Sequence, residues 1–286
     1  MSEESIKYGQ QDLNLPHDVV QLPSGGKFYK SKKKSVKVGY LTAADENILM
    51  GVNTDELVIS LLRNKIYEPD LRPEEMLNGD IEAVLIWLRN TSFGPEYNVN
   101  VLDPKTGNRF PTVISLEELN YKKTQFEADE NGLFTTVLPK SQKTVKIRPL
   151  KYKELNDIQK IGESYPVGRV APIMTIRLEK QIVEIEGNSD TAFIAKAIQS
   201  MPIMDSKYIR KFMKENEPGI ELIKTVIAPS GDKVDVDINF GVEFFRVFYW
   251  LPKIPIRRVL YLGKTSSPIL WWIFKYAGLY QKIHGW

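Results

Sequence analysis

Histidine and cysteine, the residues that most often carry covalent or metal chemistry, are scarce in this chain. Its 286 residues include no cysteine and two histidines, His17 and His284, near opposite ends. Without cysteine there is no disulfide and no thiolate metal site, and two distant imidazoles leave little for a histidine-rich centre. The sequence therefore predicts no metal and no cofactor, and its lack of cysteine suits a reducing cytosol.

Catalytic motifs are also missing. Neither histidine lies in a recognisable motif with a nucleophile, so a Ser-His-Asp triad would need distant residues to converge. The stretch Pro23–Lys27 resembles a phosphate loop but lacks the required spacing, and Phe28 stands where Ser or Thr would bind magnesium. Acidic pairs such as Asp45/Glu46 fall in expected first helical turns, where they complement the helix dipole. We predict no catalytic residues and no enzyme.

Charge is unevenly distributed along the chain. The net charge of +3 is too small for the whole molecule to bind nucleic acid electrostatically. Residues 244–286 hold seven Lys or Arg and no Asp or Glu, whereas the other 243 residues hold 32 basic and 36 acidic side chains. The basic run Lys30–Lys34 lacks interleaved aromatic residues, and we interpret it as a solvated turn. No nucleic-acid partner is predicted.

The N-terminus is polar and lacks the apolar region of a signal peptide. No run of 18 apolar residues occurs, so no membrane-spanning helix is expected. We expect residues 1–18 to be flexible and ordered structure to begin at Val19.

Residues 19–137 contain turn, strand and helix signals in a definite order. Gly25 and Gly26 permit the positive φ angles of a turn, and Asp80 is expected to cap a helix that stops near Gly94. The expected elements are a strand–turn–strand at Leu22–Tyr29, a strand at Ser35–Gly39, helices starting at Thr42, Thr54, Pro73 and Asp80, and a hairpin of Asn98–Leu102 and Arg109–Ile114.

The same order recurs in residues 138–243. Lys143–Ile147 (KTVKI) repeats Lys34–Val38 (KSVKV), Glu154 falls where Asp45 did, and Asp205 is expected to cap a helix as Asp80 does. A helix is expected at Pro172–Val183, and a second hairpin at Glu221–Ile227 and Lys233–Ile238. The spacing between matching residues runs from 109 to 125, which indicates a gapped duplication instead of a short tandem repeat.

We therefore predict an α+β fold made of two strand–helices–β-hairpin units. Each unit offers an apolar strand face and amphipathic helices, and the two copies could bury these faces against each other about a pseudo-twofold axis. The predicted parts are a flexible segment at 1–18, a first repeat at 19–137, a second repeat at 138–243 and an aromatic, basic C-terminal tail at 244–286.

The tail holds 12 of the 30 aromatic residues and four of the five tryptophans. Burying several such rings together supplies on the order of 10 kcal/mol before association costs. Three fates are open: packing on its own body, docking on a partner protein, or lying in a membrane interface. We favour partner docking, with an anchor formed by Trp250, Trp271, Trp272, Phe274, Tyr276, Arg257 and Arg258.

Several motifs resemble the hub assembly proteins of T4-type contractile phage baseplates. The most specific pair is LPSGGKFY at Leu22–Tyr29 with LTAADENIL at Leu41–Leu49, and the resemblance covers roughly residues 19–245. Further matches are Asn78-Gly79-Asp80, Gly94-Pro95-Glu96-Tyr97, Leu138-Pro139-Lys140-Ser141, Ile185-Glu186-Gly187-Asn188 and Asn216-Glu217-Pro218-Gly219-Ile220-Glu221-Leu222.

The resemblance implies a structural or chaperone-like factor that binds baseplate hub or tail-tube proteins, in the host cytoplasm during assembly or in the virion tail baseplate. It carries no catalytic residues. Relatives hold a zinc-ribbon knuckle, Cys-Pro-x-Cys-Gly, at the hairpin turns. Here the turns read Asp103–Gly107 and Ala228–Gly231, so zinc is not expected and Pro and Gly geometry must hold them.

Relatives also stop soon after a Phe-Phe motif like Phe244-Phe245, so the resemblance does not cover the role of the tail. The alternative function is a peripheral assembly factor that uses this tail to bind a host membrane surface. The oligomeric state and the identity of the partner stay open.

Overall fold

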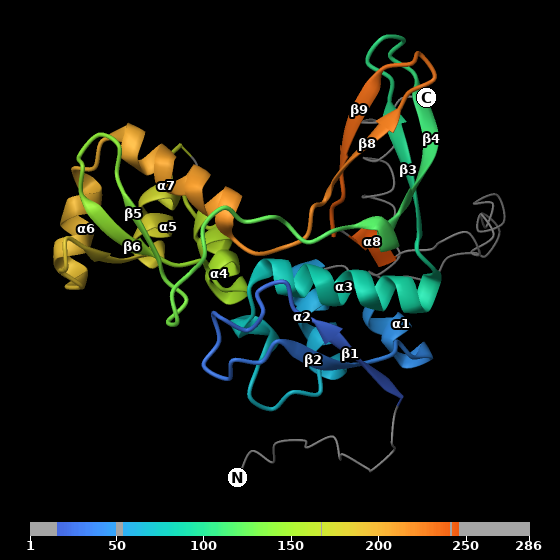
Figure 1. Ribbon diagram of the computed structural model, residues 1–286. Helices are drawn as coiled ribbons and strands as arrows, with labels where there is room; N and C mark the ends of the chain where they lie inside the picture. Colours follow the sequence, from blue (N-terminus) through green and yellow to red (C-terminus); the bar gives the residue numbers. More distant parts are fainter. Residues whose placement is uncertain (1–15, 50–53, 167, 241, 246–286) are drawn as a thin grey trace, which may run out of the picture. The chain divides into compact units, whose positions relative to one another are not determined.

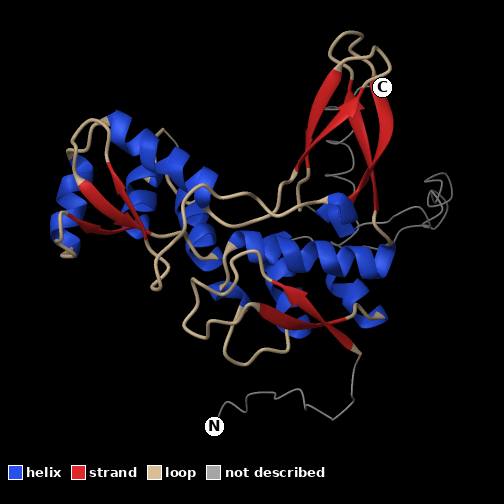
Figure 2. Cartoon of the chain, in the orientation of Figure 1, coloured by secondary structure: helices blue, strands red, loops and turns tan. Residues whose placement is uncertain are grey.

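The computed structural model of the protein describes residues 16–49, 54–166, 168–240 and 242–245 (Figure 1). Within them, helices alternate with four small antiparallel sheets, so the predicted α+β class is confirmed (Figure 2). The chain divides into one compact unit of residues 1–247 and a second of residues 248–286, which lies outside the described residues.

The first half follows the predicted order of elements closely. Its elements are β1 (His17–Gln21), β2 (Ser35–Gly39), α1 (Ala43–Leu49), α2 (Thr54–Lys65), η1 (Pro73–Glu75), α3 (Asn78–Phe93), β3 (Glu96–Leu102), β4 (Arg109–Ser115) and η2 (Leu116–Glu118). Two expectations were wrong. Strand β1 includes His17 and Asp18, which were assigned to the flexible segment, and Lys27–Tyr29 forms turns instead of a second strand.

The second half contains β5 (Phe134–Val137), β6 (Thr144–Ile147), α4 (Tyr152–Glu163), α5 (Ile173–Gln181), β7 (Ile182–Ile185), α6 (Thr191–Gln199), α7 (Ile203–Asn216), β8 (Ile223–Ile227), β9 (Lys233–Asp237) and α8 (Val242–Phe245). The sequence did not predict β5, β7 or α6. The helix predicted at Pro172–Val183 ends at Gln181 with no breaker residue, because the backbone of the β-branched segment β7 pairs with β6 instead. Strand β5 pairs with β6 across the predicted boundary at 137/138.

Apolar side chains gather in two separate clusters. The first core packs β1 and β2 on α2 and α3, and it includes Val36, Val38 and Leu62. The second core packs β5, β6 and β7 on α5, α6 and α7, and it includes Ile147 and Phe212. The faces of β1–β2 and of β5–β7 are thus buried by nearby helices and not against each other, whereas the inner face of β8–β9 packs against the first core. The pseudo-twofold relation between the halves stays a prediction.

A shared helix start supports the predicted match between Asp45 and Glu154. The Thr42 amide donates to the carboxylate of Asp45 (2.7 Å), and the Lys151 amide donates to Glu154 (3.0 Å). Each carboxylate closes a capping-box turn, which supplies an acceptor for an amide that has no partner within the helix. Each also binds a nearby cation, buried Lys65 for Asp45 and half-buried Arg148 for Glu154.

Candidate functional site

All seven predicted partner-binding residues lie in the tail, outside the described residues: Trp250, Trp271, Trp272, Phe274, Tyr276, Arg257 and Arg258. Their role as an anchor stays a prediction. The residues just before the tail are held by the body. Phe244 and Phe245 of α8 are buried in the first core, and the Phe244 ring lies 5.6 Å from Tyr97 and 4.7 Å from Phe240. These two residues, assigned to the tail from sequence, therefore belong to the body.

Asp80 is fully buried in the first turn of α3, but it does not cap that helix, because the cap position is Leu77. Its carboxylate accepts hydrogen bonds from the Ser24 amide (2.9 Å) and from the Tyr29 hydroxyl, which accepts in turn from the Leu77 amide (2.9 Å). Burial raises the pKa of Asp80, and burial together with the Asp80 charge raises that of Tyr29. The LPSGGKFY segment is thus a loop held by a buried aspartate.

Asp205 makes the matching contact in the second half. It is buried in the first turn of α7, whose cap is Pro202, and its carboxylate accepts from the amides of Lys140 (2.7 Å) and Ser141 (3.0 Å). The prediction that Asp80 and Asp205 are helix caps was therefore wrong in both halves. Each carboxylate binds its Leu-Pro loop instead of capping its own helix. The loop amides donate hydrogen bonds to it and thereby stabilise it in its buried position.

The two hairpins, β3–β4 and β8–β9, lie side by side in Figure 1 and are joined at their tips by Asp103. The carboxylate of Asp103 accepts from the hydroxyl of Ser230 (2.9 Å) and from three amides, those of Lys105, Thr106 and Ser230. Burial would raise the pKa of Asp103, but these hydrogen bonds outweigh it and hold the pKa below its usual value.

The sequence suggested that Pro and Gly geometry alone holds these turns. The hydrogen bonds of Asp103 show that a side chain also holds them. An aspartate before proline at the start of a turn is a known Asx-turn signal, and that signal could have identified Asp103.

The backbone just after α7 packs closely against the start of α3, and this contact is called the junction below. A Cβ at Gly79 would overlap the backbone of Pro218 and Gly219, so only glycine allows this approach. Next to it lie two half-buried carboxyls, Glu82 and Glu217. Burial raises the pKa of each to about 7, although the charge of Lys122 opposes the shift at both.

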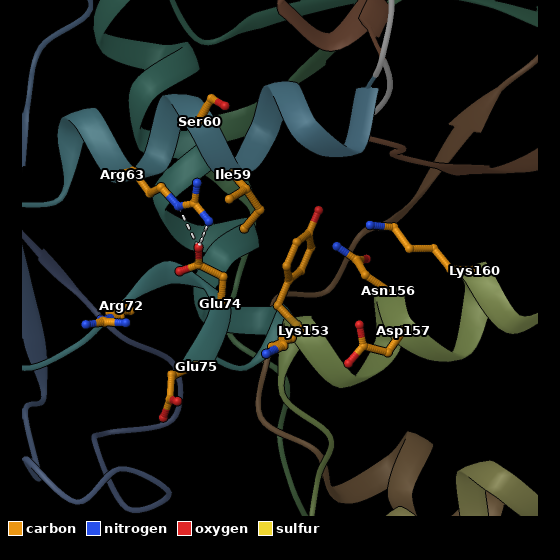
Figure 3. A pocket seen from close by; sticks show the side chains of 11 residues that line it. Ile59, Ser60, Arg63, Arg72, Glu74, Glu75, Lys153, Asn156, Asp157 and Lys160 are labelled. Carbon is orange, nitrogen blue, oxygen red and sulfur yellow. Dashed lines mark hydrogen bonds and ion pairs between the residues drawn. The ribbon is translucent and has the colours of Figure 1, made fainter. Parts of the chain in front are cut away.

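A half-open groove of about 670 Å³ lies between α2, η1 and α4 (Figure 3). Figure 3 shows side chains of α2 and η1 on one side of it and a polar face of α4 on the other. Arg63 and Glu74 form an ion pair across α2 and η1, with the Arg63 Nε 2.6 Å from a Glu74 oxygen. The α4 face is formed by Lys153, Asn156, Asp157 and Lys160.

This groove offers hydrogen-bond donors and acceptors from α2, η1 and α4. Arg72, Lys153 and Lys160 form no ion pair with any residue of the described ranges. The groove can bind a polar segment of a partner by charge, and the helical spacing of its α4 residues was a signal the sequence contained.

Within the described part of the chain, no group of three or more His, Cys, Asp or Glu residues could hold a metal ion. In the same residues, no helix has the length and apolar character needed to cross a bilayer.

Comparison with known proteins gives one match. A family model described as T4 bacteriophage base plate protein matches residues 17–246. No curated protein matches the chain, and no solved structure matches it. The family match ends where the described body ends, so the tail lies beyond it.

Proposed function

Because the chain belongs to the family of T4 bacteriophage base plate proteins, we propose that it serves assembly of the baseplate hub by binding other proteins. Membership in the family makes it a structural protein of a phage tail baseplate. The finer role, as an assembly factor or chaperone-like factor that binds hub or tail-tube proteins, is the proposal.

The family match over residues 17–246 is the observation that carries this proposal. The contacts of the body agree with it, because its buried charged groups are used to hold loops, turns and junctions. Asp80, Asp205 and Asp103 each accept hydrogen bonds from backbone amides of distant segments. Such hydrogen bonds hold distant segments of a scaffold together, and these carboxylates therefore have a structural role.

In this proposal the tail binds the partner. It is rich in aromatic residues and positively charged, and aromatic and Arg side chains are the usual energetic centres of protein interfaces. It also continues from a defined position, because Phe244 and Phe245 are held in the first core. A rigid attachment point lowers the entropy that a docked segment would otherwise lose.

The test is a truncated chain that lacks residues 250–286, compared with full-length protein and with a Trp271→Phe, Trp272→Phe control that keeps aromatic side chains. The truncated body should keep its circular dichroism spectrum and lose co-purification with hub proteins, while the control keeps both. A truncated body that aggregates would show that the tail is part of the core, and the proposal would then fail.

A second candidate, membrane binding, is favoured by the seven basic and zero acidic residues of the tail. Flotation of the full-length chain with anionic and with neutral liposomes separates the two functions. If the chain binds neither kind of vesicle, membrane binding is excluded and hub binding remains. Strong flotation with anionic vesicles together with no hub protein bound would reverse that order.

A further inference from the structure

Helix α7 has an outer face that combines cations with exposed apolar side chains. Its inner face, with Ile209 and Phe212, is buried in the second core. Ile203 and Met204 are 73% and 62% exposed at its start. Further along the helix the outer positions are Lys207, Arg210, Lys211 and Lys214, together with the exposed acid Glu215.

Most of this charge is unbalanced. Lys207, Arg210 and Lys214 form no ion pair within the described ranges, and Lys211 has only a long contact with Glu215, at 3.7 Å. Arg210 donates to the sulfur of Met174, which is itself 52% exposed and extends the apolar area onto α5. Exposed apolar side chains on the same helix as unpaired cations offer both apolar area and charge to a partner.

The hairpin β8–β9 has a face of the opposite charge. Residues alternate between its two faces, and Val226 and Val236 on the inner one pack against the first core. On the outer face Ile223 and Ile227 are 54% and 72% exposed. Their cross-strand neighbourhood includes Asp235 and Asp237, with Lys233 the single cation opposite Ile227.

We propose that the α7 face of one molecule binds the outer β8–β9 face of a second copy of this chain. The two faces match in charge, since cations of α7 meet the carboxylates of β9, and both add exposed aliphatic side chains. Their lengths also agree, at about 16 Å from Ile203 to Lys214 and about 13 Å from Ile223 to Ile227. Both faces are exposed within one molecule, so they do not bind each other there.

This contact is heterologous, because each molecule contributes two different surfaces. Such contacts propagate head to tail and give either a closed ring or an open filament. The contact depends on charge, so the association weakens as salt rises. It is independent of the tail and of hub binding, and either inference can fail without the other.

Sedimentation equilibrium of the full-length chain over a concentration series, at low and high salt, tests this self-association. One variant, Lys207→Glu with Lys214→Glu, reverses the basic face, and another, Asp235→Lys with Asp237→Lys, reverses the acidic face. A control, Lys143→Glu with Lys196→Glu, makes the same charge change at exposed lysines elsewhere. Circular dichroism and melting curves check that each variant folds.

We expect wild type and control to associate, and each face variant to lose affinity for itself by about tenfold or more. An equimolar mixture of the two face variants should associate again, since each supplies the face that the other lacks and the reversed faces also attract. A wild-type chain that stays monomeric throughout overturns the proposal. So do face variants that associate as wild type does, or a mixture that stays monomeric.

Discussion

The loops that follow β1 and β5 solve one problem with different residues. In both, a buried aspartate from the first turn of a helix accepts hydrogen bonds from the Leu-Pro loop. Asp80 receives one amide and a buried Tyr29 hydroxyl, whereas Asp205 receives two amides of the more exposed residues Lys140 and Ser141. The first loop is sealed by an aromatic side chain, whereas in the second loop Asp205 binds two amides of a part-buried segment. Equivalent positions can therefore differ in how much stability depends on them.

Removing each aspartate should expose that difference most strongly. Asp80→Ala leaves the Ser24 amide and the Tyr29 hydroxyl buried without an acceptor, at a cost of about 3 to 5 kcal/mol in the free energy of unfolding. Asp205→Ala should cost about 1 to 2 kcal/mol, because the two hydrogen bonds that it removes are only part-buried and involve no buried hydroxyl. Urea unfolding with hydrogen exchange at both loops measures the two costs. Equal losses would mean that the aromatic seal adds nothing.

The backbone of the first loop offers a second test, in which the loop is compared with the turn of the β3–β4 hairpin. Gly26 has φ +74° and a Cβ there would overlap the Lys33 carbonyl, whereas Gly107 has φ +73° with open space around it. Gly26→Ala should cost about 2 to 4 kcal/mol, and the matched Gly107→Ala only about 1 kcal/mol of backbone strain. Thermal melts of both variants check the ratio, and comparable losses would show that the loop yields easily.

The junction and the hairpin tips should respond to pH in opposite directions. The pKa values of Glu82 and Glu217 are about 7 in the folded chain, above the unfolded value near 4.5. Their stabilising contribution is therefore complete below pH 4.5 and is lost as pH rises through about 7. Glu217→Gln should raise the free energy of unfolding at pH 8 by about 1 to 2 kcal/mol and flatten its pH dependence. An unchanged profile from pH 5 to 8 would contradict this.

Asp103 gives the opposite and smallest pH effect. Hydrogen bonds hold its folded pKa below the unfolded value, so its contribution is present above the unfolded pKa and is lost as pH falls through the folded pKa. Asp103→Asn should lower protection of the Ser230 amide against hydrogen exchange at neutral pH. In acid the variant and the wild type should converge. Full protection of that amide in Asp103→Asn would show that the hairpins pack together without the hydrogen bonds between Asp103 and Ser230.

Local signals in the sequence determined most of the elements. The alternation in Ser35–Gly39, the glycines of the LPSGGKFY turn, the Gly94 helix stop and both hairpins depend on neighbours a few residues apart, and each was predicted within two residues. Repetition of the KSVKV pattern also placed Glu154 where Asp45 falls, and in the structure both carboxylates accept an amide at a helix start. The family resemblance was also inferred from local motifs. The family match supports a phage baseplate protein, and the role in hub assembly stays a proposal.

Only the tertiary structure decided where the long-range partners lie. Asp80 and Asp205 were predicted as helix caps because a capping motif is local, yet their carboxylates bind loop residues 51 to 56 and 64 to 65 positions away. The short strands β5 and β7 form because β6 pairs with both. Each has only four residues, and so short a hydrophobic pattern does not predict which strand it pairs with. Two cores form, and the first also takes in Ile220, Ile238 and Phe244 of the second half, which no local pattern indicates. Sequence gives the propensity of a segment, but burial and pairing depend on which distant segments approach it.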